Sequence, residues 1–73
     1  MVNVNKLKAR MALMEYTQKG LAEEMTARGV KTSVNTLSSK MNGKTKFDCV
    51  DADVICEILK VTKPADKAEI FLA

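Results

Sequence analysis

Apolar residues recur at steps of three and four positions along the chain, and this spacing places them on one face of successive helices. The clearest example is the stretch 32–44, in which Val34, Leu37 and Met41 share one face of a short helix. The opposite face carries small, uncharged hydrogen-bonding residues, and Gly43 supplies a stop of the left-handed type. Aromatic residues are scarce, and Gly and Pro occupy only a few punctuating positions. This pattern predicts an all-α fold.

The same spacing predicts a compact bundle of five helices in a single domain that spans residues 1–73. The first helix is expected over 5–16, the second after a capping Thr17 and before Gly29, the third from Thr32 or Ser33 to before Gly43, the fourth after a capping Asp48, and the last over 65–72. Gly20 is expected to permit a close approach of the third helix.

The core is expected to draw on every predicted helix. Its expected members are Val4, Leu7, Met11, Met14, Leu21, Ala22, Met25, Val34, Leu37, Met41, Val50, Val54, Ile55, Ile58, Leu59, Ala68, Phe71 and Leu72, with Phe47 as an anchor after the third helix. For Val34, contact with a thymine methyl group is a second interpretation.

Charge is distributed unevenly along the sequence. Residues 1–47 contain nine Lys or Arg and three Glu, whereas residues 48–73 contain three Lys and six Asp or Glu. One part of the domain is therefore basic, and a basic surface on a small domain attracts polyanions, nucleic acid first. The count alone is equally compatible with ordinary surface charge.

Catalytic and metal chemistry find little support in the sequence. Cys49 and Cys56 lie in one predicted helix with Cα atoms roughly 10 Å apart, too far for a disulfide. The chain has no His, and two thiols alone do not make a zinc site. Asp48, Asp51 and Asp53 suit the positive end of a helix dipole without any catalytic role. We therefore expect no metal, no cofactor and no enzyme activity.

Membrane insertion is not expected either. No apolar run approaches the roughly 18 residues that a membrane-spanning helix needs, and the N-terminus lacks an apolar secretory segment. The expected protein is soluble and cytoplasmic.

The second and third predicted helices have the layout of a helix-turn-helix. A capped helix is followed by a turn containing Gly29, a short helix with a Ser, Thr and Asn face, and an exit rich in Lys. In such motifs the second helix enters the major groove, where polar side chains reach base edges and lysines meet phosphates. The candidate DNA-binding residues in this region are Thr32, Ser33, Asn35, Thr36, Ser39, Lys40, Asn42, Lys44 and Lys46.

Three segments resemble the Cro and repressor (XRE-like) type of helix-turn-helix domain from temperate phages. They are TQKGLAEEM at 17–25, NTLSSKMNGK at 35–44 and VICEIL at 54–59. The resemblance extends over about 6–72, and its most specific parts are the Thr-Gln-x-x-Leu-Ala start and the Leu-x-x-x-Met-Asn-Gly-Lys exit. It implies a lambda-repressor-like five-helix bundle, a double-stranded operator as ligand, a homodimer in many members, and a bacterial host cell.

The resemblance also implies roles for individual residues. Gln18, at the start of the second helix, would contact phosphate and support the third helix. Base contacts would come from Asn35, Thr36 and Ser39, and backbone contacts from Lys44 and Lys46.

Two departures from the family leave an alternative open. Ala22 and Leu37 are fifteen positions apart, a longer connection than is usual in the family. The polar face also lacks Arg and Gln, and Ser and Thr discriminate bases less than Asn does. The alternative is an antirepressor or modulator that binds a phage repressor instead of DNA. Leu13, Tyr16 and Ile70, expected off the core, are the candidate protein interface for such a partner or for a homodimer.

Overall fold

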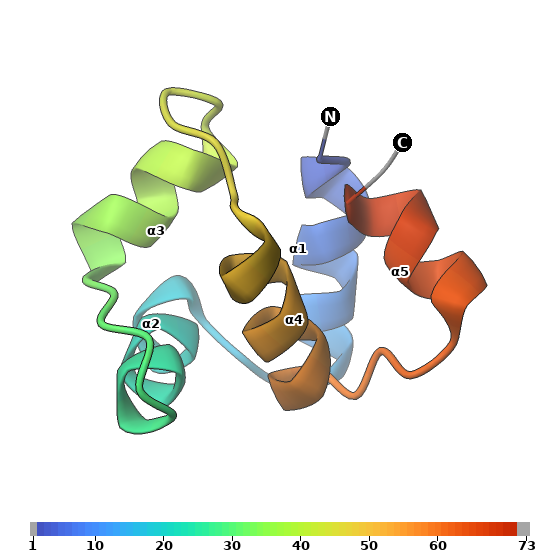
Figure 1. The fold of residues 1–73 in the computed structure, drawn as a ribbon, viewed down its shortest axis with the longest axis horizontal. Coiled ribbons are helices and arrows are strands. Elements are labelled where there is room, and N and C mark those ends of the chain that lie inside the picture. The colour runs from blue at the N-terminus through green and yellow to red at the C-terminus, as the bar shows by residue number, and fades with distance from the viewer. Residues whose placement is uncertain (1, 72–73) are drawn as a thin grey trace.

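The computed structural model describes residues 2–71, which form five α-helices and no strand within that range. The helices are α1 (Val4–Leu13), α2 (Gln18–Ala27), α3 (Val34–Met41), α4 (Cys49–Ile58) and α5 (Pro64–Phe71) (Figure 1). The predicted all-α class and the five helices are confirmed, whereas Leu72 lies outside the described residues. Within that part of the chain, no helix has the length and apolar character required to cross a membrane.

Four helices begin where a side chain accepts a backbone N–H from the first turn. The caps are Asn3 for α1, Thr17 for α2, Ser33 for α3 and Asp48 for α4. In α4 the side chain of Asp51 reaches back to the Asp48 N–H, which completes a capping box. The expected caps Thr17 and Asp48 are therefore confirmed, and of the two expected starts of the third helix, Thr32 and Ser33, the structure has Ser33 as the cap.

The same four helices end with one residue in the left-handed region, followed by an N–H that bonds back to a carbonyl five positions earlier. Two of these residues are the expected Gly29 and Gly43, with φ of 95° and 80°. The other two are Glu15 and Lys60, with φ of 61° and 57°. The turn at Glu15 ends α1 at Leu13, three residues before the expected end.

The core lies where all five helices meet. Leu7, Leu21, Met25, Leu37, Ile55 and Leu59 are its largest fully buried side chains. Helix α2 packs against α3 and α4, and α1 packs against α5. Figure 1 shows α4 in the middle of the view, with α2 and α3 on one side and α5 on the other.

Three expectations about helix faces are wrong. Val50 is 59% exposed instead of buried, because α4 turns Asp51 inward at this level. Ile70 is 6% exposed, because α5 packs against α1 and the Asn3 N–H donates to the Ile70 carbonyl at 2.6 Å. A Cβ at Gly20 would lie 3.3 Å from Thr17 Oγ1, so Gly20 makes room for the start of its own helix and not for α3.

Candidate nucleic-acid interface

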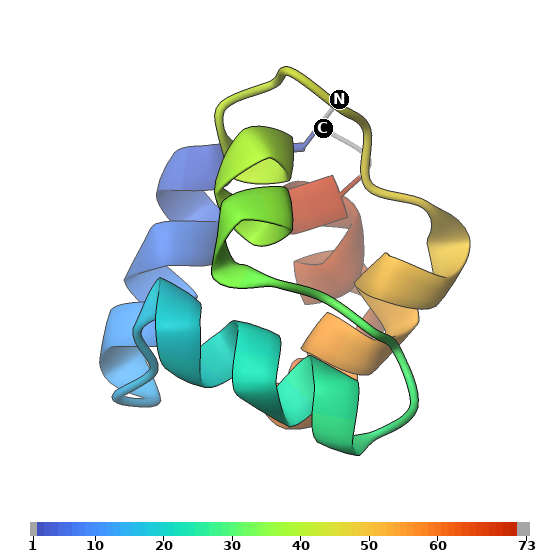
Figure 2. The ribbon, with the colours of Figure 1, turned by 90° about the vertical axis from the view of Figure 1, so that its left-hand side faces the viewer.

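Helix α3 lies at the surface with its polar side turned outward. Leu37 and Met41 are buried beneath it, whereas Asn35 and Thr36 are exposed. Figure 2 shows α2 and α3 on the side that faces the viewer, with α1, α4 and α5 behind them. Val34 is 41% exposed, so it belongs to this outer surface more than to the core.

Some polar side chains on the outer face of α3 form hydrogen bonds within the protein, whereas others do not. The Ser33 hydroxyl accepts the Thr36 N–H at 3.1 Å and donates to Thr36 Oγ1 at 3.0 Å, so both side chains help to start the helix. Asn42 Nδ2 lies 3.5 Å from Ser38 Oγ. The side chain of Asn35 makes no hydrogen bond with any residue in 2–71. Its amide therefore has both a donor and an acceptor available for a ligand.

Thr32 is not part of the exposed face, which corrects the expectation from the sequence. It is 7% exposed, and its hydroxyl donates to the Val30 carbonyl at 3.0 Å. Its N–H donates to Thr26 Oγ1 at 3.1 Å, and its carbonyl oxygen lies 2.9 Å from the same hydroxyl. Thr26, which the sequence did not single out, thus holds the long connection between α2 and α3.

Lys40 is held by an acidic partner, whereas the sequence predicted it to be a DNA-binding residue. Its Nζ donates to Asp51 Oδ2 on α4, and the two side chains are only 17% and 4% exposed. The same Asp51 oxygen accepts the Asp48 N–H at 3.2 Å. In return, the Asp51 N–H donates to Asp48 and holds the pKa of that carboxyl below its ordinary value of 3.8. The spacing Asp-x-x-Asp was the available signal for this capping box.

The segment 25–47 contains five Lys or Arg and no acidic residue. Arg28 pairs with Glu24 at 3.2 Å and with Glu57 at 3.9 Å, and Lys40 pairs with Asp51. Lys31, Lys44 and Lys46 are exposed and make no ion pair with residues 2–71. The connection before α3 and the loop after it therefore both present positive charge to solvent.

Gln18 lies at the start of α2, close to the far end of α3. It shares a shallow hollow of about 220 Å³ with Lys8, Thr17, Tyr16 and Met41, among other residues. The structure therefore brings Gln18 near the last turn of α3, whereas Asn35 and Thr36 lie in its first turn.

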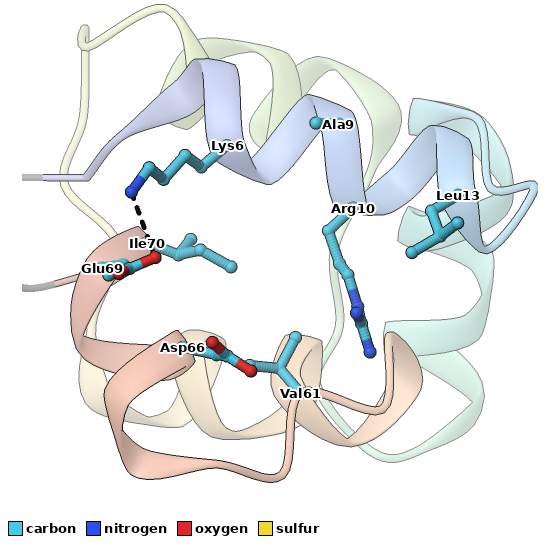
Figure 3. Close-up of a pocket in the computed structure, with 8 residues that line it drawn as sticks. All are labelled: Lys6, Ala9, Arg10, Leu13, Val61, Asp66, Glu69 and Ile70. Atoms are coloured by element: carbon cyan, nitrogen blue, oxygen red, sulfur yellow. Dashed lines mark hydrogen bonds and ion pairs between the residues drawn. The ribbon is translucent and has the colours of Figure 1, made fainter.

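The three residues suggested for a protein interface do not form one surface. Leu13 is 69% exposed at the end of α1, beside a groove of about 290 Å³ between α1 and α5 (Figure 3). Ile70 lines this groove but is buried, and the Lys6–Glu69 ion pair at 3.1 Å crosses it. Tyr16 lies instead in the hollow beside Gln18. Only Leu13 retains the exposure that was expected.

No protein-family model, curated protein or solved structure matches this chain. Within residues 2–71, no three His, Cys, Asp or Glu side chains come together as a metal site would require.

Proposed function

We propose that this protein is a small Cro-like transcriptional regulator that inserts α3 into the major groove of operator DNA. The observation that carries the proposal is the side chain of Asn35, which is exposed in the first turn of α3 and makes no hydrogen bond with residues 2–71. In helix-turn-helix proteins, base edges are contacted by the N-terminal part of the second helix. An Asn side chain in that position pairs bidentately with adenine.

The surrounding charge supports the same proposal. The exposed lysines Lys44 and Lys46 follow α3, and Lys31 precedes it, with no acidic residue between them in the sequence. Phosphate contacts of this kind give affinity without sequence preference, while the base contacts supply specificity. Thr36 and Ser39 are the other members of the face that would lie near bases.

The first test concerns specificity. Fluorescence anisotropy would compare a duplex containing the DNA beside the protein's own gene with a scrambled duplex of equal length. Asn35→Ala is expected to weaken binding to the first duplex by about 1–3 kcal/mol and to leave the weaker binding to the second unchanged. Absence of binding to either duplex at low salt would overturn the proposal.

The second test concerns phosphate contact. Lys44→Gln is expected to weaken binding to both duplexes alike and to reduce the slope of log K against log salt by about 0.9. Lys63→Gln, an exposed lysine in the loop before α5, is the matched control and should leave the slope unchanged.

Of the three residues suggested for a protein interface, only Leu13 is an exposed apolar side chain, so the antirepressor alternative is tested there. Co-purification with an adjacently encoded repressor, lost in Leu13→Glu, would favour that alternative. Under the DNA-binding proposal, Leu13→Glu removes no DNA contact, so both duplex affinities stay unchanged in a monomer and fall together if Leu13 joins a homodimer.

A further inference from the structure

Among the ion pairs that form within residues 2–71, the Lys40–Asp51 pair differs from the others because it is shielded from water. The side chains of the other four pairs are between 39% and 72% exposed, whereas those of Lys40 and Asp51 are 17% and 4% exposed. Exposed pairs contribute little to stability, while removal of one partner from a shielded pair leaves a charge without compensation. This pair therefore constrains the elements that carry it.

Those elements are the last turn of α3 and the first turn of α4. Lys40 lies one residue before the end of α3, and Asp51 is the third residue of α4. The eight-residue α3 has an exposed loop after it and a long connection before it. Helix α3 packs against α2 and buries Leu37 and Met41, and the ion pair links its last turn to α4.

Asp51 is itself held in place by the capping box of α4. One of its oxygens accepts both the Lys40 ammonium group and the Asp48 N–H, and its own N–H donates to Asp48 Oδ1 at 2.8 Å. The Lys40 ammonium group at the end of α3 therefore meets a carboxylate that the capping box holds at the start of α4.

We propose that Asp51 is a positioning residue for α3, and that its pairing with Lys40 withholds the Lys40 charge from DNA. The second half of this inference rests on the proposed function, whereas the first half concerns the free protein. In the complex with DNA, the pair would hold α3 in the orientation that base contact requires. Phosphate contact would then come from Lys44 and Lys46 instead of Lys40.

The first half is tested by amide hydrogen exchange of the free protein, with α2 as internal reference. Lys40→Met and Asp51→Asn are each expected to accelerate exchange of the α3 amides by about tenfold or more, because each leaves one charge of the pair uncompensated. Lys40→Arg retains the charge and should preserve protection. The double variant Lys40→Met/Asp51→Asn should recover part of the protection of the α3 amides, because neither charge of the pair remains. Unchanged α3 exchange in both single variants would overturn the positioning role.

The second half is tested by the salt dependence of DNA binding. Lys40→Met is expected to leave the slope of log K against log salt unchanged, because Lys40 contacts no phosphate. Asp51→Asn releases Lys40 and should steepen the slope by up to about 0.9, with a larger gain on scrambled DNA than on the specific duplex. A slope reduced by about 0.9 in Lys40→Met would show a phosphate contact and overturn this half.

The exchange measurement uses the free protein and the salt measurement uses DNA, so the positioning role can be judged separately from the proposed function. If the wild-type protein bound no DNA, the proposed function and the withheld charge would both fail. The exchange measurement would still decide whether Asp51 positions α3.

Discussion

Thr26 lies in the last turn of α2, and its hydroxyl serves backbone groups on both sides of the connection to α3. Its oxygen lies 3.0 Å from the Ala22 carbonyl oxygen and 2.9 Å from that of Thr32, and it accepts the Thr32 N–H at 3.1 Å. A hydroxyl has one hydrogen, so it donates to one of these carbonyls at a time. The Thr26 side chain thus ties the long connection between α2 and α3 back to the end of α2.

Thr26→Val keeps the shape of the side chain and removes the hydroxyl. The N–H of Thr32, a buried residue, would lose its partner, and we expect a loss of about 1–3 kcal/mol in the free energy of unfolding. Denaturation by urea measures this loss. Thr26→Ser retains the hydroxyl and is the control. Equal stability of Thr26→Val and wild type would show that the hydroxyl does not hold the connection.

Lys60 ends α4 in the left-handed region, with φ of 57°. A residue with a Cβ is strained there, whereas Gly is not, so Lys60→Gly is expected to raise the free energy of unfolding by about 1 kcal/mol. Arg10 donates to the Lys60 carbonyl at 2.8 Å, and this bond to the backbone survives the change. Lys60→Ala removes the charge but keeps the strain, so it should show no gain. A gain of equal size in Lys60→Ala would assign the effect to charge.

At the scale of helices, the sequence predicted what is local and missed what depends on neighbours. The caps Thr17 and Asp48 act within one turn, so the local sequence identified them, and it narrowed the start of α3 to Thr32 or Ser33. The helical period could not place Val50, because the position turned inward at this level is Asp51, whose partner Lys40 lies on another helix.

For the candidate site, too, the sequence predicted the residues whose placement is local and missed those whose partners lie elsewhere in the chain. Asn35 and Thr36 were correctly expected to be exposed, since Leu37 and Met41 determine the buried face of α3. Thr32 and Lys40 were placed on the surface because their partners Thr26 and Asp51 are brought near only by the fold. No periodicity within α3 carries that information.

The cap of α4 gives the protein a defined response to acid. The folded-state pKa of Asp48 is lowered, chiefly by the N–H of Asp51. Its contribution to stability is therefore present above the ordinary pKa of 3.8 and is lost as pH falls through the lower folded value. Stability of the wild type, measured by thermal unfolding, should decline below about pH 4.

Asp48→Asn keeps a capping side chain that does not titrate. Its unfolding temperature should be lower than that of the wild type at pH 7, and the difference should shrink as pH is lowered through this range. A difference that stays constant from pH 7 to the acid limit would contradict the role given to the Asp48 carboxylate.

At the scale of the whole molecule, the first and last helices are in contact with each other and with the segment that follows α3. Helix α5 packs against α1, and the Asn3 N–H bonds to the Ile70 carbonyl. Phe71 of α5 also contacts Phe47, which follows the basic loop after α3. Contacts thus run from Phe47, after the basic loop, through α5 to α1.

The Phe47–Phe71 contact permits a direct test of that continuity. The rings meet edge to face, with centroids 6.0 Å apart and planes at 77°, a geometry that adds about 0.5–1.5 kcal/mol beyond burial. A double-mutant cycle with Phe47→Leu and Phe71→Leu should show a coupling of this size in the free energy of unfolding. The exposed Val50→Ala, combined with Phe71→Leu, should be additive. Additivity of the two Phe changes would mean that the loop after α3 is not energetically linked to α5, and that its lysines are positioned by α3 alone.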